Sequence, residues 1–142
     1  MTPRGRSCVT RAYPALPLLL MIGVLAGCDH PSDRNPSAPT GAPVLTAIAP
    51  VQAAIGDIIT LTGSRFEASG NGVKIGTGYV NGVASPAGTS MTFALPPALS
   101  ACSPNAQACI ALAIVVTPGV YQVTVVNTNG TSNPMTLQVV AR

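Results

Sequence analysis

The sequence has no tryptophan, one histidine and few charged residues. Charged side chains make up 8% of its 142 residues, and aromatic side chains make up 4%. This composition is unusual for an enzyme, and the 14 glycines and 14 prolines indicate frequent turns rather than a helix-rich fold. A chain of this length has room for one domain.

The excess of positive charge is confined to the start of the chain. The full sequence has a net charge of +3, but Arg4, Arg6 and Arg11 all precede a long apolar run. From Cys28 onward the charges balance, so the chain lacks the basic surface that attracts phosphate backbones, and we expect no nucleic-acid partner. The balanced residues are Arg34, Arg65, Lys74 and Arg142 against Asp29, Asp33, Asp57 and Glu67.

Catalytic groups are scarce in the second part of the chain. Residues 44–142 contain no histidine and only two carboxylates, Asp57 and Glu67. They flank a predicted strand, which at ~3.3 Å per residue separates them by more than roughly 15 Å. Glycoside hydrolysis needs its two carboxyl groups within ~10 Å. We therefore interpret both as solvated turn residues, and predict that the chain is not an enzyme, with no catalytic residues and no cofactor.

The first 28 residues have the three parts of a bacterial export signal. Three arginines come first, and the apolar run from Ala15 to Val24 has the length of a secretory hydrophobic region, too short to span ~30 Å of hydrocarbon. The segment Leu25–Cys28 (LAGC) follows at once and resembles the bacterial lipobox. The resemblance implies cleavage before Cys28 and lipidation of its thiol, which would attach the chain to a lipid bilayer. An ordinary signal peptide or membrane helix with a chance cysteine is the alternative.

The residues after Cys28 indicate where the chain resides. Asp29 resembles the signal that retains enterobacterial lipoproteins in the inner membrane, although an ordinary linker residue fits equally well. We expect a bacterial envelope protein that faces the periplasm or the cell exterior, and the choice between inner and outer membrane stays open. Residues 29–43 are rich in proline and small polar residues, which predicts a disordered linker. The predicted organisation is a signal peptide at 1–27, lipidated Cys28 and linker at 28–43, and one domain at 44–142.

Short β-rich runs alternate with turn residues from Val44 to Arg142. Several runs alternate apolar and polar residues, and no window shows a helical period. The pattern predicts an all-β fold, an antiparallel sandwich of seven or eight strands. The predicted strands are 44–48, 58–62, 73–75, 79–83, 91–95, 110–116, 120–126 and 135–140. The residues predicted to form the core include Ile59, Leu61, Phe66, Phe93, Tyr121, Val123, Val125 and Leu137.

A series of segments in this part of the chain resembles an IPT/TIG domain. The resemblance covers essentially all of residues 44–140. It implies an immunoglobulin-like fold of the E-set type and a module that binds or spaces rather than catalyses. The segments are Ile48–Pro50, Gly56–Phe66, Val73–Gly76, Met91–Pro96, Gly119–Val125 and Asn127–Asn133.

Individual residues of these segments have expected physical roles. We predict that Gly63 lets the chain turn where a β-branched residue would be strained, and that Phe66 folds back into the core. Asn129-Gly130 should tolerate the positive φ of a tight hairpin. Gly119–Tyr121 resembles a tyrosine corner, in which the hydroxyl group bonds nearby backbone; a surface-binding tyrosine is the alternative.

The segment from Pro97 to Pro118 departs from the family pattern, in which the strand near Leu95 leads quickly to the Gly-x-Tyr strand. It contains Cys102 and Cys109, which we expect to pair in an exported protein. A ring this small contributes roughly 2.5 kcal/mol at best, so the pair should fix a loop shape more than the fold. No histidine lies nearer than His30, so we predict no metal site, and the spacing is not C-x-x-C.

The apolar run from Ile110 to Val116 follows this ring. A short continuous apolar run favours a strand that is buried on both faces. The alternative is an edge strand, which would be an aggregation hazard or a partner surface.

The most favoured function is a non-catalytic interaction or structural module that contacts another envelope protein. Loops on a rigid sandwich often bind partners, and the loop from Ala98 to Ala108 is the part that departs from the scaffold; a stapled insertion without a binding role is the alternative. A carbohydrate-binding or cell-surface adhesion module is the competing interpretation, but sugars usually stack on exposed aromatics, and only Tyr79 is expected to be exposed. The candidate binding residues are Ser100, Ser103, Pro104, Asn105 and Gln107.

Overall fold

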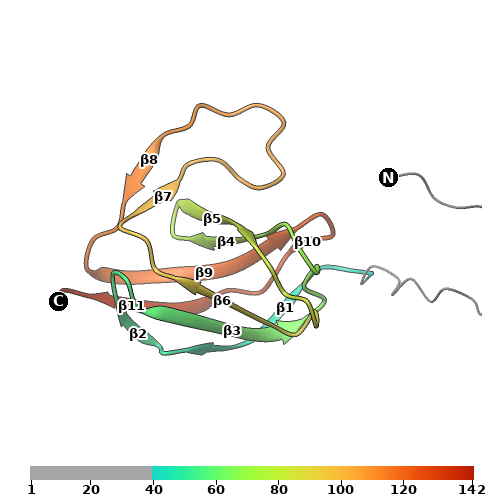
Figure 1. Cartoon of the computed structure of the whole chain (residues 1–142), viewed down its shortest axis with the longest axis horizontal. Coiled ribbons are helices and arrows are strands. Elements are labelled where there is room, and N and C mark those ends of the chain that lie inside the picture. The colour runs from blue at the N-terminus through green and yellow to red at the C-terminus, as the bar shows by residue number, and fades with distance from the viewer. Residues whose placement is uncertain (1–39) are drawn as a thin grey trace, which may run out of the picture. The chain divides into compact units, whose positions relative to one another are not determined.

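The computed structural model describes residues 40–142, which form two β-sheets that enclose one core (Figure 1). The predicted signal peptide, Cys28 and the linker up to residue 39 lie outside the described residues. Within the described range no residue is helical. No helix in that part of the chain is long and apolar enough to cross a membrane.

The smaller sheet has three strands in the order β1-β3-β6. Strands β1 (Val44–Ala49) and β6 (Ser90–Ala94) pair antiparallel with the two edges of β3 (Ile58–Ser64). Ile59 and Leu61 of β3 are fully buried, because alternate residues of a strand point to the same face. The predicted inward face of this strand is confirmed.

The larger sheet has eight strands in the order β2-β11-β9-β4-β5-β7-β8, with β10 paired to β9. Strand β2 runs parallel to β11, and every other pair described is antiparallel. The antiparallel prediction is therefore correct with one exception. The strands are β2 (Gln52–Ala54), β4 (Asn71–Ile75), β5 (Gly78–Val83), β7 (Ala98–Ser100), β8 (Ala113–Val115), β9 (Gly119–Asn127), β10 (Gly130–Thr131) and β11 (Met135–Val140).

Each of the eight predicted strands overlaps an observed strand. The sequence did not predict β2, β7 and β10, which contain only two or three residues. Strands so short carry no alternation by which they can be recognised. The predicted strand 110–116 shrinks to the three residues of β8.

The core lies between the two sheets and contains all the predicted residues. Phe66, just after β3, is buried as expected, and Tyr121 packs against the cluster while half-buried. The other predicted core residues that are buried are Ile59, Leu61, Phe93, Val123, Val125 and Leu137.

Tyr121 forms the predicted tyrosine corner. Its hydroxyl group donates a hydrogen bond to the carbonyl of Thr117 at 2.8 Å and accepts one from the backbone N–H of Thr117 at 3.3 Å. These bonds fix the turn that leads into β9. The alternative of a tyrosine available for surface binding is therefore not supported.

Gly63 does not form a turn, so its predicted role was wrong. It permits the backbone of β1 to lie close to β3. It lies inside β3, where a Cβ atom would collide with the carbonyl oxygen of Val44 and lie 2.6 Å from Cζ of Phe66. The left-handed conformation falls on Arg65 instead, with φ of 61°. The carbonyl of Arg65 accepts a hydrogen bond from the Asn127 side chain at 3.0 Å, which holds this turn.

Candidate functional site

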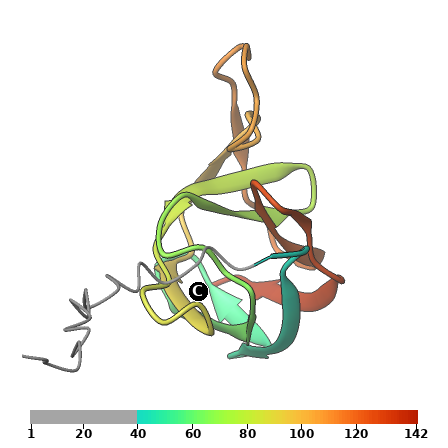
Figure 2. The same ribbon diagram turned by 90° about the vertical axis from the view of Figure 1, so that its right-hand side faces the viewer.

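The segment from Pro97 to Pro118 forms a projecting hairpin, which we call the arm. Strands β7 and β8 make its base, with Leu99 opposite Ile114. Figure 2 shows the arm projecting beyond one side of the sandwich. The base joins the larger sheet through one registered pair, Tyr79 opposite Ser100. The arm is thus the most peripheral part of the larger sheet.

A disulfide between Cys102 and Cys109 closes a ring within the arm, as predicted. The two Cα atoms lie 5.7 Å apart. The carbonyl of Cys102 accepts a hydrogen bond from the side chain of Asn81 on β5 at 2.9 Å. The ring is therefore closed covalently and also bonded to the sheet.

The first half of the ring lies against the larger sheet. Pro104 covers Gly72 of β4 so closely that a Cβ atom at Gly72 would lie 2.5 Å from its Cγ. Asn105 donates a hydrogen bond from its side chain to the carbonyl of Asn127, on β9, at 2.8 Å. Together with Asn81, these contacts fix the ring to three strands of the sheet.

Most of the five candidate binding residues make contacts within the chain. The hydroxyl of Ser100 accepts a hydrogen bond from the backbone N–H of Cys102 at 3.0 Å, and Pro104 and Asn105 hold the arm against the sheet. Ser103 is half-buried, whereas Gln107 is exposed. The structure thus places Ser100 on β7 at the base of the arm, Ser103, Pro104 and Asn105 in the first half of the ring, and Gln107 in its second, exposed half.

The apolar run from Ile110 to Val116 is not buried on both faces, contrary to prediction. Ile110, Leu112 and Val115 are 79%, 62% and 71% exposed, and only Val116 is buried. The run belongs to a projecting hairpin, and its outer strand has a single neighbour among the described strands. A continuous apolar sequence can occur both in a central strand and in an edge strand, so the sequence pattern wrongly favoured a strand that is buried on both faces. The alternative of an exposed edge strand is the one observed.

Asp57 has a structural role at the turn before β3. It accepts hydrogen bonds from the backbone N–H of Ala54 at 2.8 Å and from Arg142 at 2.9 Å. The N–H of Ala54 and then the Arg142 guanidinium hold the pKa of Asp57 below its ordinary value. An exposed carboxylate with a lowered pKa is a poor proton donor or acceptor near neutral pH.

Glu67 supports the hairpin between β9 and β10. Its carboxylate accepts hydrogen bonds from the backbone N–H and the hydroxyl of Thr128 and from the side chain of Asn129. Gly130 closes the hairpin with φ of 134°, which agrees with the predicted positive φ. Among residues 40–142 no three His, Cys, Asp or Glu side chains come together in a way that could hold a metal ion.

The sequence predicted that Tyr79 would be exposed and available for carbohydrate binding, which is not what the structure shows. The structure leaves it half-buried on β5, with Nζ of Lys74 at 6.0 Å from the centre of its ring. A sugar that stacks on this ring competes with the lysine for the same π-surface. The geometry therefore gives carbohydrate binding no added support.

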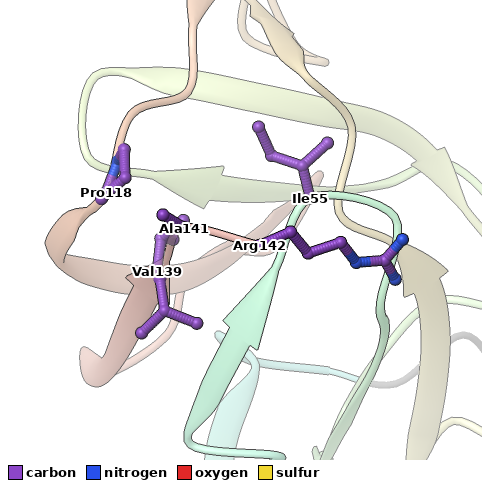
Figure 3. A pocket seen from close by; sticks show the side chains of 6 residues that line it. Ile55, Pro118, Val139, Ala141 and Arg142 are labelled. Carbon is purple, nitrogen blue, oxygen red and sulfur yellow. The ribbon is translucent and has the colours of Figure 1, made fainter.

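An apolar hollow of about 430 Å³ lies at the end of β11 (Figure 3). Apolar side chains dominate its lining, and the guanidinium of Arg142 is bonded to Asp57. The hollow therefore offers apolar contact without a polar group to orient a ligand. Its lining residues are Ile55, Pro118, Val139, Val140, Ala141 and Arg142.

Comparison with known proteins agrees with this architecture. Residues 43–139 match the family model of the IPT/TIG domain, and no curated protein matches the chain. Among solved structures, γ-CGTase from alkalophilic Bacillus clarkii is 22% identical, with a TM-score of 0.53 over 73% of this chain. The match spans 13% of the length of that enzyme, and at this identity it shows a shared fold alone.

Proposed function

The chain belongs to the IPT/TIG domain family, and from this premise we propose that it is a non-catalytic interaction module of the bacterial cell envelope. The observation that supports the proposal most directly is the exposure of the second half of the arm, from Ile110 to Val115. This half exposes Ile110, Leu112 and Val115 to solvent, three large apolar side chains within six residues of one projecting segment, and exposed apolar surface of this kind can mark an interaction site. We propose that this surface contacts another envelope protein.

The arm is suited to binding because its shape is set before a partner arrives. The disulfide closes the ring, and the contact of Pro104 with Gly72 and the hydrogen bond of Asn105 hold the ring against the sheet. Ordering a loop on a partner costs conformational entropy, and a loop that is already held has less to lose. The first half of the ring, which lies against the sheet, thus favours binding without itself contacting the partner.

Removing the exposed apolar side chains of the arm should strongly reduce capture of the partner. We expect the double variant Ile110→Ser and Leu112→Ser to lower recovery of crosslinked envelope proteins at least tenfold, because the lost contacts lie at the proposed interface. The stability should change by less than about 0.5 kcal/mol for each substitution, since both sites are exposed. The measurement is affinity recovery of the tagged chain from crosslinked envelopes, followed by mass spectrometry.

A matched control is the double variant Val51→Ser and Ile58→Ser. These residues are also largely exposed, but they lie away from the arm, beside β2 and on β3. They should leave recovery unchanged. Equal recovery with the arm variant and the wild type would show that the arm is not the contact surface.

We also propose that Cys28 carries the lipid that holds the module on the membrane. The support is the segment Leu25–Cys28, which follows a short apolar run. Two or more acyl chains give stable attachment, whereas one chain binds only marginally. The structure places residues 40–43 with the domain, where Pro43 is buried, so the linker is shorter than the predicted 29–43. As a random coil, residues 29–39 would reach on the order of 20 Å from the membrane, which leaves the arm room to meet a neighbouring protein.

Replacing Cys28 by alanine should prevent both lipidation and processing. The thiol is the proposed site of acylation, so the variant should accumulate as precursor without incorporating labelled palmitate. Cys8→Ala is the matched control, because Cys8 lies in the segment that would be removed, and it should be labelled and processed normally. Palmitate labelling of the Cys28→Ala chain at the wild-type level would contradict the assignment.

A further inference from the structure

Strand β8 leaves one complete edge of the larger sheet open. The backbone N–H of Ala101 donates to the carbonyl of Leu112 at 3.0 Å, and the N–H of Val116 donates to the carbonyl of Pro97 at 2.9 Å. Backbone groups alternate between the two sides of a strand. The N–H and C=O groups of Ala113 and Val115 therefore point away from β7, and β8 has no other neighbouring strand within residues 40–142.

Apart from its short length of three residues, this edge lacks the features that usually protect a free strand. Proteins block exposed edges with charged side chains, proline or bulges. There is no charged residue from Ile75 to Ala141, and β8 pairs with β7 without a register shift. The edge is thus regular, uncharged and apolar, which is the state that favours the addition of another strand.

We propose that a second copy of this chain adds its own β8 to this edge, antiparallel and about a two-fold axis at Ile114. The inference rests on the proposed function, because it names the partner that the arm contacts. In this register Ala113 lies opposite Val115 of the second copy, and Val115 lies opposite Ala113 of the second copy. The open N–H and C=O groups of Ala113 and Val115 in each copy then all form hydrogen bonds. With the axis at Ala113 or Val115 instead, only two of these four groups would meet a partner within β8 of the other copy.

The side chains of β8 fit this arrangement. Ile114 packs against the core of its own domain, so Ala113 and Val115 lie on the opposite face of the hairpin. Each exposed valine would then meet a small alanine across the axis, without a clash between two large side chains. A two-fold interface brings a surface close to its own copy, so any charge near the axis would face a like charge. The uncharged arm avoids that repulsion.

The size of the interface predicts a weak dimer in solution. Three paired residues and the adjoining apolar side chains bury less than the ~1,200 Å² that is typical of a stable interface. Attachment of both copies to one membrane raises their effective concentration and compensates for low affinity. We therefore expect reversible association at high concentration in solution and substantial pairing on the membrane.

The first test measures the association of the purified chain from Asp29 onward, which contains every core residue that the structure describes. Sedimentation velocity up to near-millimolar concentration should show a reversible dimer. Val115→Lys should weaken it at least tenfold, because it places two like charges beside the axis. Val120→Lys is the matched control, since Val120 is 68% exposed but lies on β9, away from the open edge. A wild-type chain that stays monomeric, or a Val115→Lys chain that dimerises as the wild type does, overturns the proposal.

The second test examines the register in cells that make the full-length chain. A short bismaleimide should crosslink an Ala113→Cys chain to a Val115→Cys chain more efficiently than it crosslinks either variant to itself. The native disulfide leaves no other thiol within the described residues available to the reagent. Equal crosslinking in all three combinations would contradict pairing about Ile114.

The two proposals fail in different ways. If the purified chain stays monomeric while the exposed arm residues are still required to capture a different envelope protein, the second copy is not the partner and the interaction function stands. If arm substitutions change neither self-association nor capture, both proposals are wrong.

Discussion

Replacing Leu61 by alanine should lower the free energy of unfolding by about 2–5 kcal/mol, the range for deleting a large buried aliphatic side chain. Leu61 is fully buried in the middle of β3, with Ile48 of β1 and Met91 of β6 opposite it. Both neighbouring strands are held by backbone hydrogen bonds, so they cannot move inward to fill the space. The site therefore cannot collapse easily, which places the expected loss in the upper part of the range.

Ile58→Ala provides the comparison on the same strand. The substitution removes a side chain of similar size, but Ile58 is 60% exposed, so little buried area disappears. We expect a loss below about 1 kcal/mol. Urea melts of the wild type and the two variants, compared by midpoint at constant slope, give both values. A loss under half a kcal/mol for Leu61→Ala would contradict the inward face of β3.

The part of the fold that the sequence predicted is the part built from alternating strands. Leu61, Val123 and Leu137 each stand in a run where apolar and polar residues alternate, and each is fully buried. Such runs identify their inward face because one face packs on the core and the other meets solvent. The tyrosine corner was likewise recognisable, since Tyr121 and its partner Thr117 are only four positions apart.

The sequence could not predict which strand lies at an edge. The run from Ile110 to Val116 has the composition of a buried strand, but its environment depends on how many neighbours the sheet provides. That number is a property of topology and not of the run itself. Strand β2 illustrates the same limit, because it pairs with β11 at residues more than eighty positions away, and nothing local in Gln52–Ala54 signals this partner.

The candidate site was predicted only in outline. The disulfide of Cys102 and Cys109 followed from the cysteine count, and the departure from the family pattern indicated the arm. The contacts that hold the arm join residues 21 and 22 positions apart, Asn81 with Cys102 and Asn105 with Asn127. Asparagine is common in turns and loops, so these side chains carry no pattern that distinguishes a long-range support from a local turn residue.

Replacing Gly63 by alanine should cost about 3 kcal/mol or more, because the added methyl group has no space. It would collide with the backbone carbonyl oxygen of Val44 on β1, and it would press on the ring of Phe66. A flexible side chain could rotate away, but a backbone atom moves only if the end of β1 separates from β3. Overpacking of this kind usually costs about 1–3 kcal/mol and sometimes more, and the loss of strand pairing adds to it.

Gly82→Ala separates this steric effect from the conformational preference of glycine. Gly82 has φ of 74° and nothing within 4 Å of an added Cβ atom, so only backbone strain of about 1–2 kcal/mol is expected there. The double variant Gly63→Ala and Phe66→Leu should recover part of the loss at most, since it relieves the ring but leaves the collision with Val44. If denaturant melts show that Gly63→Ala lowers the free energy of unfolding no more than Gly82→Ala does, β1 can shift to make space for the methyl group. The close approach of β1 to β3 is then not what requires glycine at this position.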